Sequence, residues 1–437
     1  MGNSAFDEPI IELANAHTPA IIQVIGVGGG GGNAVAHMYP EGFMDVQYTV
    51  VNSDKKALSD SPVPDRVQLG PGLGAGGNPE KGRELCEESI EAVRSMLGKQ
   101  TQMVFITAGM GGGTGTGASP IIAREARERG ILTIGVVTIP FLFELTPRIN
   151  KALDGVYALA KEVDALLVIN NERLRDIYPE LSVYNAFRRA DDTLLTAVKS
   201  IVDIICMHGT MNLDFCDVDT VLRGGRVAIM STAYAEGEKR VTKAINAALH
   251  SPLLNNNDIF NSKKIIISIT SSNAKPLGIE ELSELDAFMR KFRPDVITKY
   301  GLATDNGLDE RVKITILASG FGLYDKSERQ AEEQRPKPGD IISADGGERL
   351  ISFYGNLYGK PAKPRPRIYL IGTDDLSNEA LLEEMERVPT ARRSKEDYDR
   401  ICNRGTAKQE QITTNLFAHD VIFAHEFKFV DKKITRG

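Results

Sequence analysis

Runs of valine and isoleucine alternate with helical patterns along the first part of the chain. These runs are apolar on both faces, which is typical of parallel strands that helices cover on each side. The alternation predicts a doubly wound, Rossmann-like α/β domain, in which ligands bind at the carboxyl ends of the strands. The predicted strands are residues 21–27, 46–52, 103–107, 131–138 and 165–170.

One long helix follows this alternation. Apolar residues recur at three- and four-residue steps over residues 182–208, Ser182 can cap the start, and no proline interrupts the pattern. Asp191 and Asp192 interrupt the apolar stripe, so they either face solvent or contact a ligand. We expect this central helix to connect the first domain to a second one.

Beyond the helix, the pattern predicts a second α/β domain with a mixed sheet. An acidic loop, residues 209–217, comes first. From about Lys326 the composition becomes polar and proline-bearing, which predicts a linker and a flexible tail with one short island of order at residues 367–387. The predicted strands of this part are residues 226–231, 264–271 and 312–319, and the predicted helices are residues 238–250 and 279–292.

These patterns divide the chain into five parts. They are an N-terminal extension (1–19), the doubly wound domain (20–181), the central helix (182–208), the second domain (209–325), and the linker with the tail (326–437).

Composition narrows the class of protein. The formal charge of −7 over 437 residues argues against a general nucleic-acid binder, because such proteins neutralise phosphates with clustered Lys and Arg. The four cysteines form no CxxC pair and the six histidines show no paired ligand spacing, so neither a disulfide framework nor a metal site is indicated. No apolar run approaches the roughly 18 residues that span a bilayer. We therefore expect a soluble, cytoplasmic protein without direct membrane insertion.

Two glycine loops carry the candidate chemistry. Residues 26–33 and 108–117 each follow a predicted strand and open into a helix. Glycines let the backbone bring its N–H groups close to an anion, and a helix N-terminus directs its positive dipole end at the same place. An isolated glycine loop can also be a plain turn, but two loops of one construction predict a single polyphosphate ligand. A third glycine-rich turn, residues 70–77, precedes a helix predicted over residues 79–97 that Asn78 can cap.

Comparison with known phosphate-binding motifs leaves a second type of ligand, a dinucleotide, open. Neither loop contains the lysine of a Walker-type motif. Gly26, Gly28 and Gly31 fit G-x-G-x-x-G, and Asp54 follows the second strand where a dinucleotide-binding fold places its ribose-binding acid, so an NAD-dependent oxidoreductase is one alternative. The second, richer loop at residues 111–117 argues against it, because a dinucleotide fold has no use for another phosphate cradle.

The motifs together resemble those of the tubulin/FtsZ family of GTPases. The resemblance spans about residues 20–322 and implies a protein that binds GTP and GDP with Mg²⁺, polymerises head to tail with itself, and builds the division ring in the cytoplasm. It also implies that the tail binds membrane-tethering and division proteins. The motifs that carry it are GGGGGN at 28–33, NPE at 78–80, GGGTGTG at 111–117, NLDFCD at 212–217 and SPLL at 251–254.

The resemblance also implies roles for individual residues. Asn33 would reach the guanine as well as a phosphate, Glu144 and Arg148 would contact ribose and phosphate, and Asn171 a sugar or the base. Phe187 would pack on the guanine, and Asp192 would accept hydrogen bonds from its N1–H and amino group, which adenine lacks. The implied phosphate-binding residues are Gly29, Gly30, Gly31, Gly32, Asn33, Gly113, Thr114 and Gly115, and the implied residues for the attacking water are Asn212, Asp214 and Asp217. No side chain is implied as a metal ligand.

The helix length then predicts a shared active site. If Phe187 and Asp192 touch the base, the acidic loop lies about 30 Å further along the same helix, at a rise of about 1.5 Å per residue. Asp214 would therefore act on the GTP of a neighbouring subunit, in a heterologous contact that produces a filament. A structural filament that binds GTP without hydrolysing it is the second alternative.

Three features depart from the family pattern. Asp191 stands where an asparagine is usual, and Leu145-Thr146-Pro147 replaces the usual glycine and basic residues between Glu144 and Arg148. The usual C-terminal peptide is not evident, and the ending at residues 426–433 is either a partner motif or a solvated end.

Overall fold

The computed structural model describes residues 21–43, 45–178, 180, 182–249, 259–321 and 353–354, with no side chain described for Asp176. It divides into two compact units, Met1–Gly359 and Lys360–Gly437, and all elements below belong to the first. The expected N-terminal extension, the island at 367–387, and Cys402 lie outside the described residues. So does the predicted tail, apart from Phe353 and Tyr354.

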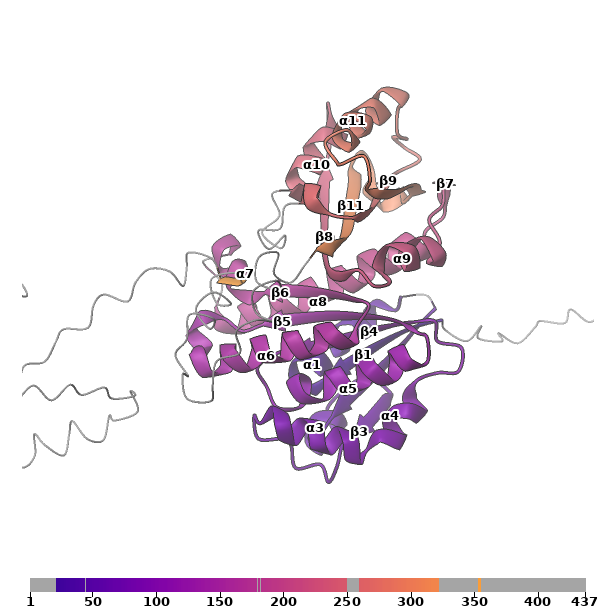
Figure 1. Ribbon diagram of the computed structural model, residues 1–437. Helices are drawn as coiled ribbons and strands as arrows, with labels where there is room; N and C mark the ends of the chain where they lie inside the picture. Colours follow the sequence, from indigo (N-terminus) through magenta and orange to yellow (C-terminus); the bar gives the residue numbers. More distant parts are fainter. Residues whose placement is uncertain are drawn as a thin grey trace, which may run out of the picture. The chain divides into compact units, whose positions relative to one another are not determined.

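A continuous sheet runs through the described part of the chain (Figure 1). It has 11 strands in the order β3-β2-β1-β4-β5-β6-β8-β11-β9-β10-β7. The strands are β1 Ile22–Val27, β2 Val46–Asn52, β3 Asp65–Gln68, β4 Met103–Gly109, β5 Leu132–Ile139, β6 Ala165–Asn170, β7 Gly209–Met211, β8 Arg226–Ala235, β9 Lys264–Ser271, β10 Ile297–Thr304 and β11 Val312–Phe321.

The helices connect and cover these strands. Those between parallel strands form the crossovers that such pairs require. They are α1 Gly28–Met38, α2 Lys55–Ser59, α3 Pro79–Glu88, α4 Ile90–Met96, α5 Thr114–Glu128, α6 Thr146–Glu162, α7 Asn171–Ile177, α8 Val183–Cys206, α9 Phe215–Leu222, α10 Arg240–Leu249 and α11 Ile279–Met289.

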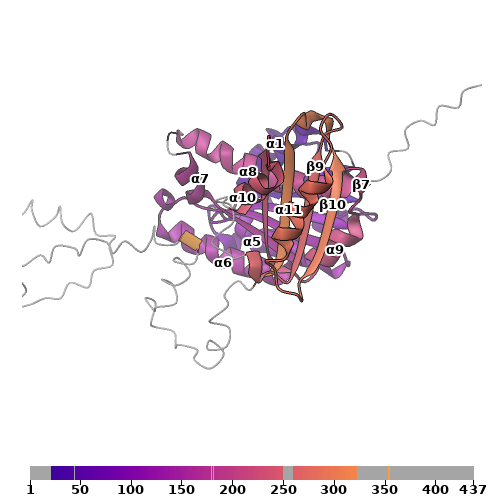
Figure 2. The same ribbon diagram turned by 90° about the horizontal axis from the view of Figure 1, so that it is seen from above.

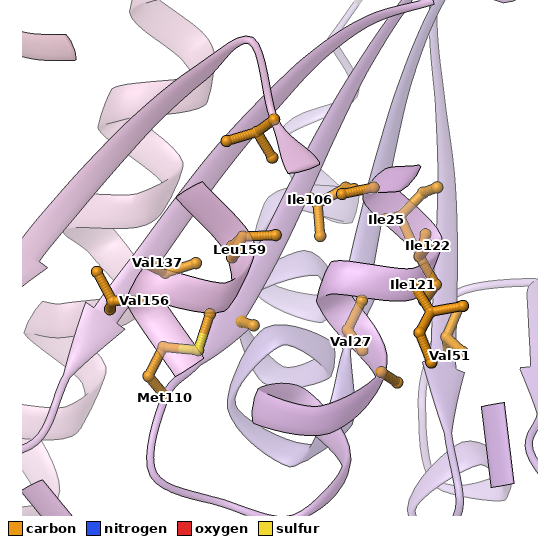
Figure 3. Close-up of a cluster of buried hydrophobic side chains, with 14 of the residues drawn as sticks. Ile25, Val27, Val51, Ile106, Met110, Ile121, Ile122, Val137, Val156 and Leu159 are labelled. Atoms are coloured by element: carbon orange, nitrogen blue, oxygen red, sulfur yellow. The ribbon is translucent and has the colours of Figure 1, made fainter. Parts of the chain in front are cut away.

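The first six strands in spatial order, β3 to β6, are all parallel, which confirms the doubly wound α/β domain. Successive residues of β1 point to opposite faces: Val24 belongs to the core beneath α1 and α8, and Ile25 to the core beneath α5 and α6. Figure 3 shows the second of these cores, where Ile25 and Ile106 of the sheet lie near Ile122 of α5. A sheet buried on both faces explains why its strands appear in the sequence as continuous apolar runs.

The second part of the sheet is mixed, as predicted. β11 runs antiparallel to β8 and β9, whereas β9 and β10 are parallel. A separate core, which includes Ile245 of α10 and Phe288 of α11, lies against it. The two parts join where β6 pairs with β8 at only two positions, Ala165 with Arg226 and Leu166 with Val227.

The structure refines several predicted boundaries. The helix predicted over residues 79–97 divides at Ser89 into α3 and α4, with Asn78 capping the first through a hydrogen bond from the Glu80 N–H. The acidic loop contains β7 and runs into α9, and β10 was not anticipated. Gly130 follows the end of α5 with φ +77°, the left-handed conformation in which glycine commonly ends a helix. Within the described ranges, no helix combines the length and the apolar character that a bilayer span requires.

Candidate functional site

The helices α1 and α5 begin directly from the two glycine loops without side-chain caps. The N-cap residues, Val27 and Gly113, have no side-chain oxygen that could accept a hydrogen bond from the N–H groups of the first turn. Neither first turn contains an acidic residue. By contrast, α2, α3, α7 and α8 are capped by the side chains of Asp54, Asn78, Asn170 and Ser182. The unsatisfied N–H groups and the dipoles of α1 and α5 make their N-termini suited to bind an anion.

The glycine loops pack against each other too closely for side chains. A Cβ on Gly31 would lie 2.1 Å from the carbonyl oxygen of Thr107, and one on Gly28 would lie 2.6 Å from the nitrogen of Gly115. A Cβ on Gly29, Gly32 or Gly112, however, would meet no atom within 4 Å. The loops therefore have a closed side that needs glycine for packing and an open side where a phosphate group fits.

Other predicted phosphate-binding residues lie beside this cradle. The Thr114 hydroxyl, at the start of α5, lies 2.6 Å from the Ser53 hydroxyl, and both residues are buried. Asn33 is exposed on α1. Gly111, with φ +97°, approaches Arg148 so closely that an added Cβ would lie 2.9 Å from its Cγ. The second glycine loop therefore contacts the segment that follows β5.

The segment after β5 contains the predicted ribose contacts. One carboxylate oxygen of Glu144 accepts the Phe141 N–H at 2.9 Å, and the other lies 3.2 Å from the Arg148 guanidinium. The Leu142 N–H donates to the buried Glu172 of α7 at 2.9 Å, which links this segment to the turn after β6. In that turn, the Oδ1 atom of Asn171 is buried without a hydrogen-bond partner among the described residues. An unpaired buried acceptor is costly, so Asn171 fits a ligand donor.

Aromatic rings line the start of α8. Phe187 meets the buried Phe141 edge-on at 5.3 Å between ring centroids and remains 39% exposed. Phe143, which stacks on Phe141 at 5.1 Å, is 49% exposed. Exposed aromatic rings at the rim of a polar cradle offer a planar surface for a base.

Asp192 and Asp191 lie one turn beyond Phe187. Asp192 Oδ1 lies 2.8 Å from Nε2 of His37, so α8 is held to α1, the helix that starts in the first glycine loop. Half-buried Asp191 has its pKa raised to about 6, chiefly by burial and further by the charge of Asp192, against a lowering effect of His37. The structure thus places Asp192 beside α1, the helix that begins at the first glycine loop, and gives Asp191 an unfavourable charge at neutral pH.

Asp191→Asn is therefore expected to stabilise the protein at neutral pH. Since the folded-state pKa is raised, the fold loses stability as pH rises from about 4 to about 6, by up to about 3 kcal/mol. Urea unfolding should show this gain for the variant at pH 7.5 and none below about pH 3, where the carboxyl is protonated in both states. Asp286→Asn, on an exposed part of α11, is the matched control. An equal gain at both pH values would contradict this explanation.

The acidic loop lies at the other end of α8. Asp214 caps α9 by accepting the Asp217 N–H at 3.0 Å, and Asp217 accepts the Asp214 N–H at 3.2 Å. Lys299 lies 2.8 Å from Asp217, and hydrogen bonds from Lys299 and from the Asp214 backbone outweigh burial, so the pKa of Asp217 is lowered. Asn212 and Asp214 are exposed, so both side chains can be reached by another molecule, although the Oδ1 atom of Asn212 already accepts the Gly209 N–H at 2.8 Å.

The structure does not bring the two sets of predicted residues together. The helix α8 has 24 residues and rises about 36 Å. Phe187 and Asp192 lie in its first half, and the acidic loop follows its end. α7 and α9 lie toward opposite ends of α8 in both views (Figure 1 and Figure 2). One chain therefore carries a glycine-loop cradle and an acidic loop that are far apart.

Leu145 shows what one departure from the family pattern does to the backbone. It has φ +73° and ψ 152°, a region that is almost restricted to glycine, and its side chain is 68% exposed. The backbone at Leu145 therefore has a conformation that favours glycine, and the leucine is strained at the position next to Glu144.

Sequence reasoning missed several residues that shape this edge. His37 and Glu172 are polar residues within helices, and Ser53 lies in the bend after β2, so no local pattern distinguishes them. Among the described residues, no group of three or more His, Cys, Asp or Glu side chains gathers as a metal site.

Comparisons with known proteins agree with this geometry. The model of the Tubulin/FtsZ family GTPase domain matches residues 21–179, and that of the FtsZ family C-terminal domain matches residues 226–322. Cell division protein FtsZ of Porphyromonas gingivalis is 45% identical over 403 residues, which cover 88% of each chain. A solved FtsZ dimer of M. jannaschii is 34% identical with a TM-score of 0.64, over 70% of this chain and 89% of that one.

More distant structures share the fold alone. CetZ2 from Haloferax volcanii is 21% identical with a TM-score of 0.58, over 70% of this chain and 95% of that one. The matches to a GTPase family give no support to the NAD-dependent alternative. The chain belongs to the FtsZ family and is a tubulin-like GTPase of cell division that forms filaments with itself.

Proposed function

We propose that GTP binds at the edge formed by the glycine loops and is hydrolysed by the acidic loop of the next subunit in a filament. The observation that carries the proposal is the placement of these two features near opposite ends of α8, a helix of 24 residues. A group at one end of a chain cannot reach a phosphate at the other. Stacking subunits head to tail brings the exposed Asp214 of one chain to the cradle of its neighbour.

In this proposal each residue has a chemical role. The γ-phosphate lies on the open side of the glycine loops, against the free N–H groups of α1 and α5. Glu144, Arg148 and Asn171 hold the ribose side, Phe187 packs on the base, and Asp192 accepts from guanine N1–H and the amino group. The neighbour's Asn212, Asp214 and Asp217 orient the attacking water, and the carboxylate of Asp214 takes its proton.

We include Mg²⁺ in the proposal because of the charge balance. Neither glycine loop contains a lysine, so the developing charge on the phosphates needs another cation, which Mg²⁺ supplies when it is bound. Mg²⁺ commonly keeps several water ligands and is held by substrate phosphates, so it needs no dedicated cluster of protein ligands.

The organisation of the chain follows from these roles. Residues 20–181 would form the GTP-binding domain, 182–208 the central helix, and 209–325 the domain that supplies the acidic loop. The extension from 326 to 437 would bind membrane-tethering and division proteins at the division site, as the family resemblance implies.

A mixing experiment tests the shared site. Asp214→Ala lacks the proposed acidic group but keeps its cradle, and Gly29→Asp keeps the acidic loop but blocks its cradle. Each variant alone should be inactive, whereas an equimolar mixture should recover a substantial part of the GTP turnover. If each hydrolysis site lay within one chain, the mixture would remain as inactive as its components.

A further inference from the structure

Two residues of the C-terminal extension are buried in the core of the GTPase domain. Phe353 is 8% exposed and Tyr354 is fully buried, and both belong to the hydrophobic cluster that α5 and α6 form with the sheet. They form the short orange segment beside α6 and α7 (Figure 1 and Figure 2). The FtsZ C-terminal domain match ends at residue 322, so this contact lies beyond what the family models cover.

The two residues make hydrogen bonds to two different loops. The Tyr354 hydroxyl donates to the carbonyl oxygen of Pro140 at 2.7 Å. The carbonyl oxygen of Phe353 accepts the side-chain N–H of Asn170 at 2.6 Å. Pro140 follows β5 and Asn170 ends β6, so adjacent residues of one segment bridge the ends of two neighbouring strands.

These two loops carry the proposed ribose and base contacts. Pro140 begins the segment that contains Glu144 and Arg148, and Asn170 is the N-cap of α7, directly before Asn171. Both polar atoms of the Asn170 side chain have a partner, since its oxygen accepts the Glu172 N–H at 2.9 Å and its amide nitrogen donates to the carbonyl oxygen of Phe353. If this segment left the core, the buried Asn170 amide would lose the backbone carbonyl of Phe353 as its acceptor, and Pro140 would lose the hydroxyl donor.

We infer that Phe353 and Tyr354 are positioning residues that hold the loops after β5 and β6 in place. They also attach the C-terminal extension to the domain beside the proposed nucleotide site, in addition to its covalent connection at the end of β11. The inference rests on the proposed function for the identity of the ligand. The anchor makes the extension a structural part of the GTPase site. A chain that ends with the family match would lack this support.

Nucleotide binding by full-length variants tests the inference. Tyr354→Phe keeps the ring and removes only the hydroxyl, and we expect it to weaken GDP binding by about fivefold. The double variant Phe353→Ala/Tyr354→Ala should weaken GDP binding by at least about tenfold, and hydrogen exchange should accelerate in residues 141–148 and 171–174.

Phe292→Ala is the matched control, because Phe292 is also 8% exposed but belongs to the core of the second part of the sheet. It should destabilise the protein while leaving GDP affinity and exchange in residues 141–148 unchanged. A folded double variant with unchanged GDP affinity and unchanged exchange would overturn the inference. If the unmodified chain bound no guanine nucleotide, the proposed function would fail, and the exchange measurement would still decide whether the anchor holds the loops.

Discussion

Asp214→Ala is expected to bind GTP as tightly as the unmodified protein and to lose hydrolysis by about 10² to 10⁴-fold, the usual contribution of a positioned acid or base. The physical reason is its place in the structure: Asp214 is exposed, follows the end of α8, and lies far from the cradle of its own chain. Its carboxylate would act on the transition state in the neighbour's site, so the ground-state affinity of its own cradle should not change.

Asp214 also caps α9, so the effect of losing the cap must be distinguished from the effect of losing the proposed catalytic carboxylate. Losing the cap costs about 1 kcal/mol for alanine, whereas asparagine is as good an N-cap as aspartate. Asp214→Asn should therefore keep the stability of the unmodified chain and still lose hydrolysis. The measurements are single-chain GTP affinity and phosphate release above the assembly threshold. Recovery of hydrolysis in the asparagine variant would mean that the cap alone matters.

Gly29→Asp is expected to abolish GTP binding while the fold becomes slightly more stable. A Cβ on Gly29 meets no atom within 4 Å, so the side chain fits without displacing the loops. Its carboxylate would satisfy the free N–H groups in the first turn of α1 and interact favourably with the helix dipole, by about 0.3 to 1 kcal/mol. It would also occupy the phosphate position and repel the phosphates, which predicts a loss of affinity of at least about 10³-fold, or ~4 kcal/mol.

Gly29→Ala serves as the graded control, since it adds a methyl group without charge. It should raise stability by up to about 1 kcal/mol through helix propensity and weaken GTP binding far less than aspartate does. Thermal unfolding without nucleotide and a GTP titration measure the two effects. Loss of stability in both variants, or GTP binding that survives the aspartate, would contradict the placement of the phosphates.

The sequence predicted five strands of the parallel half of the sheet well because they are largely buried on both faces, whereas the short, exposed edge strand β3 was not predicted. Strands β2 and β6 have the predicted limits, since their apolar runs end at polar residues such as Asn52 and Asn170. β10 escaped prediction because it is half exposed and contains Gly301, so neither an apolar run nor a clean alternation marks it. Strand β7 has only three residues and forms through its pairing with β10.

The parts of the candidate site that consist of consecutive residues, such as the glycine loops, could be predicted from the sequence. Glycine loops that open into helices have a recognisable pattern, and the structure shows why some of these glycines are required, as for Gly31 against Thr107. Contacts between distant segments have no such pattern. His37 with Asp192 and Tyr354 with Pro140 are 155 and 214 residues apart in the chain, and only the folded structure brings them together.

The measurement that tests the shared site most directly is GTP turnover per subunit as a function of protein concentration, with light scattering recorded in the same Mg²⁺-containing sample. If the acidic loop of one subunit completes the site of the next, turnover appears only above a threshold concentration and rises together with scattering. Turnover that stays constant per subunit down to high dilution, where scattering is absent, would show that each chain holds a complete site and would contradict the account.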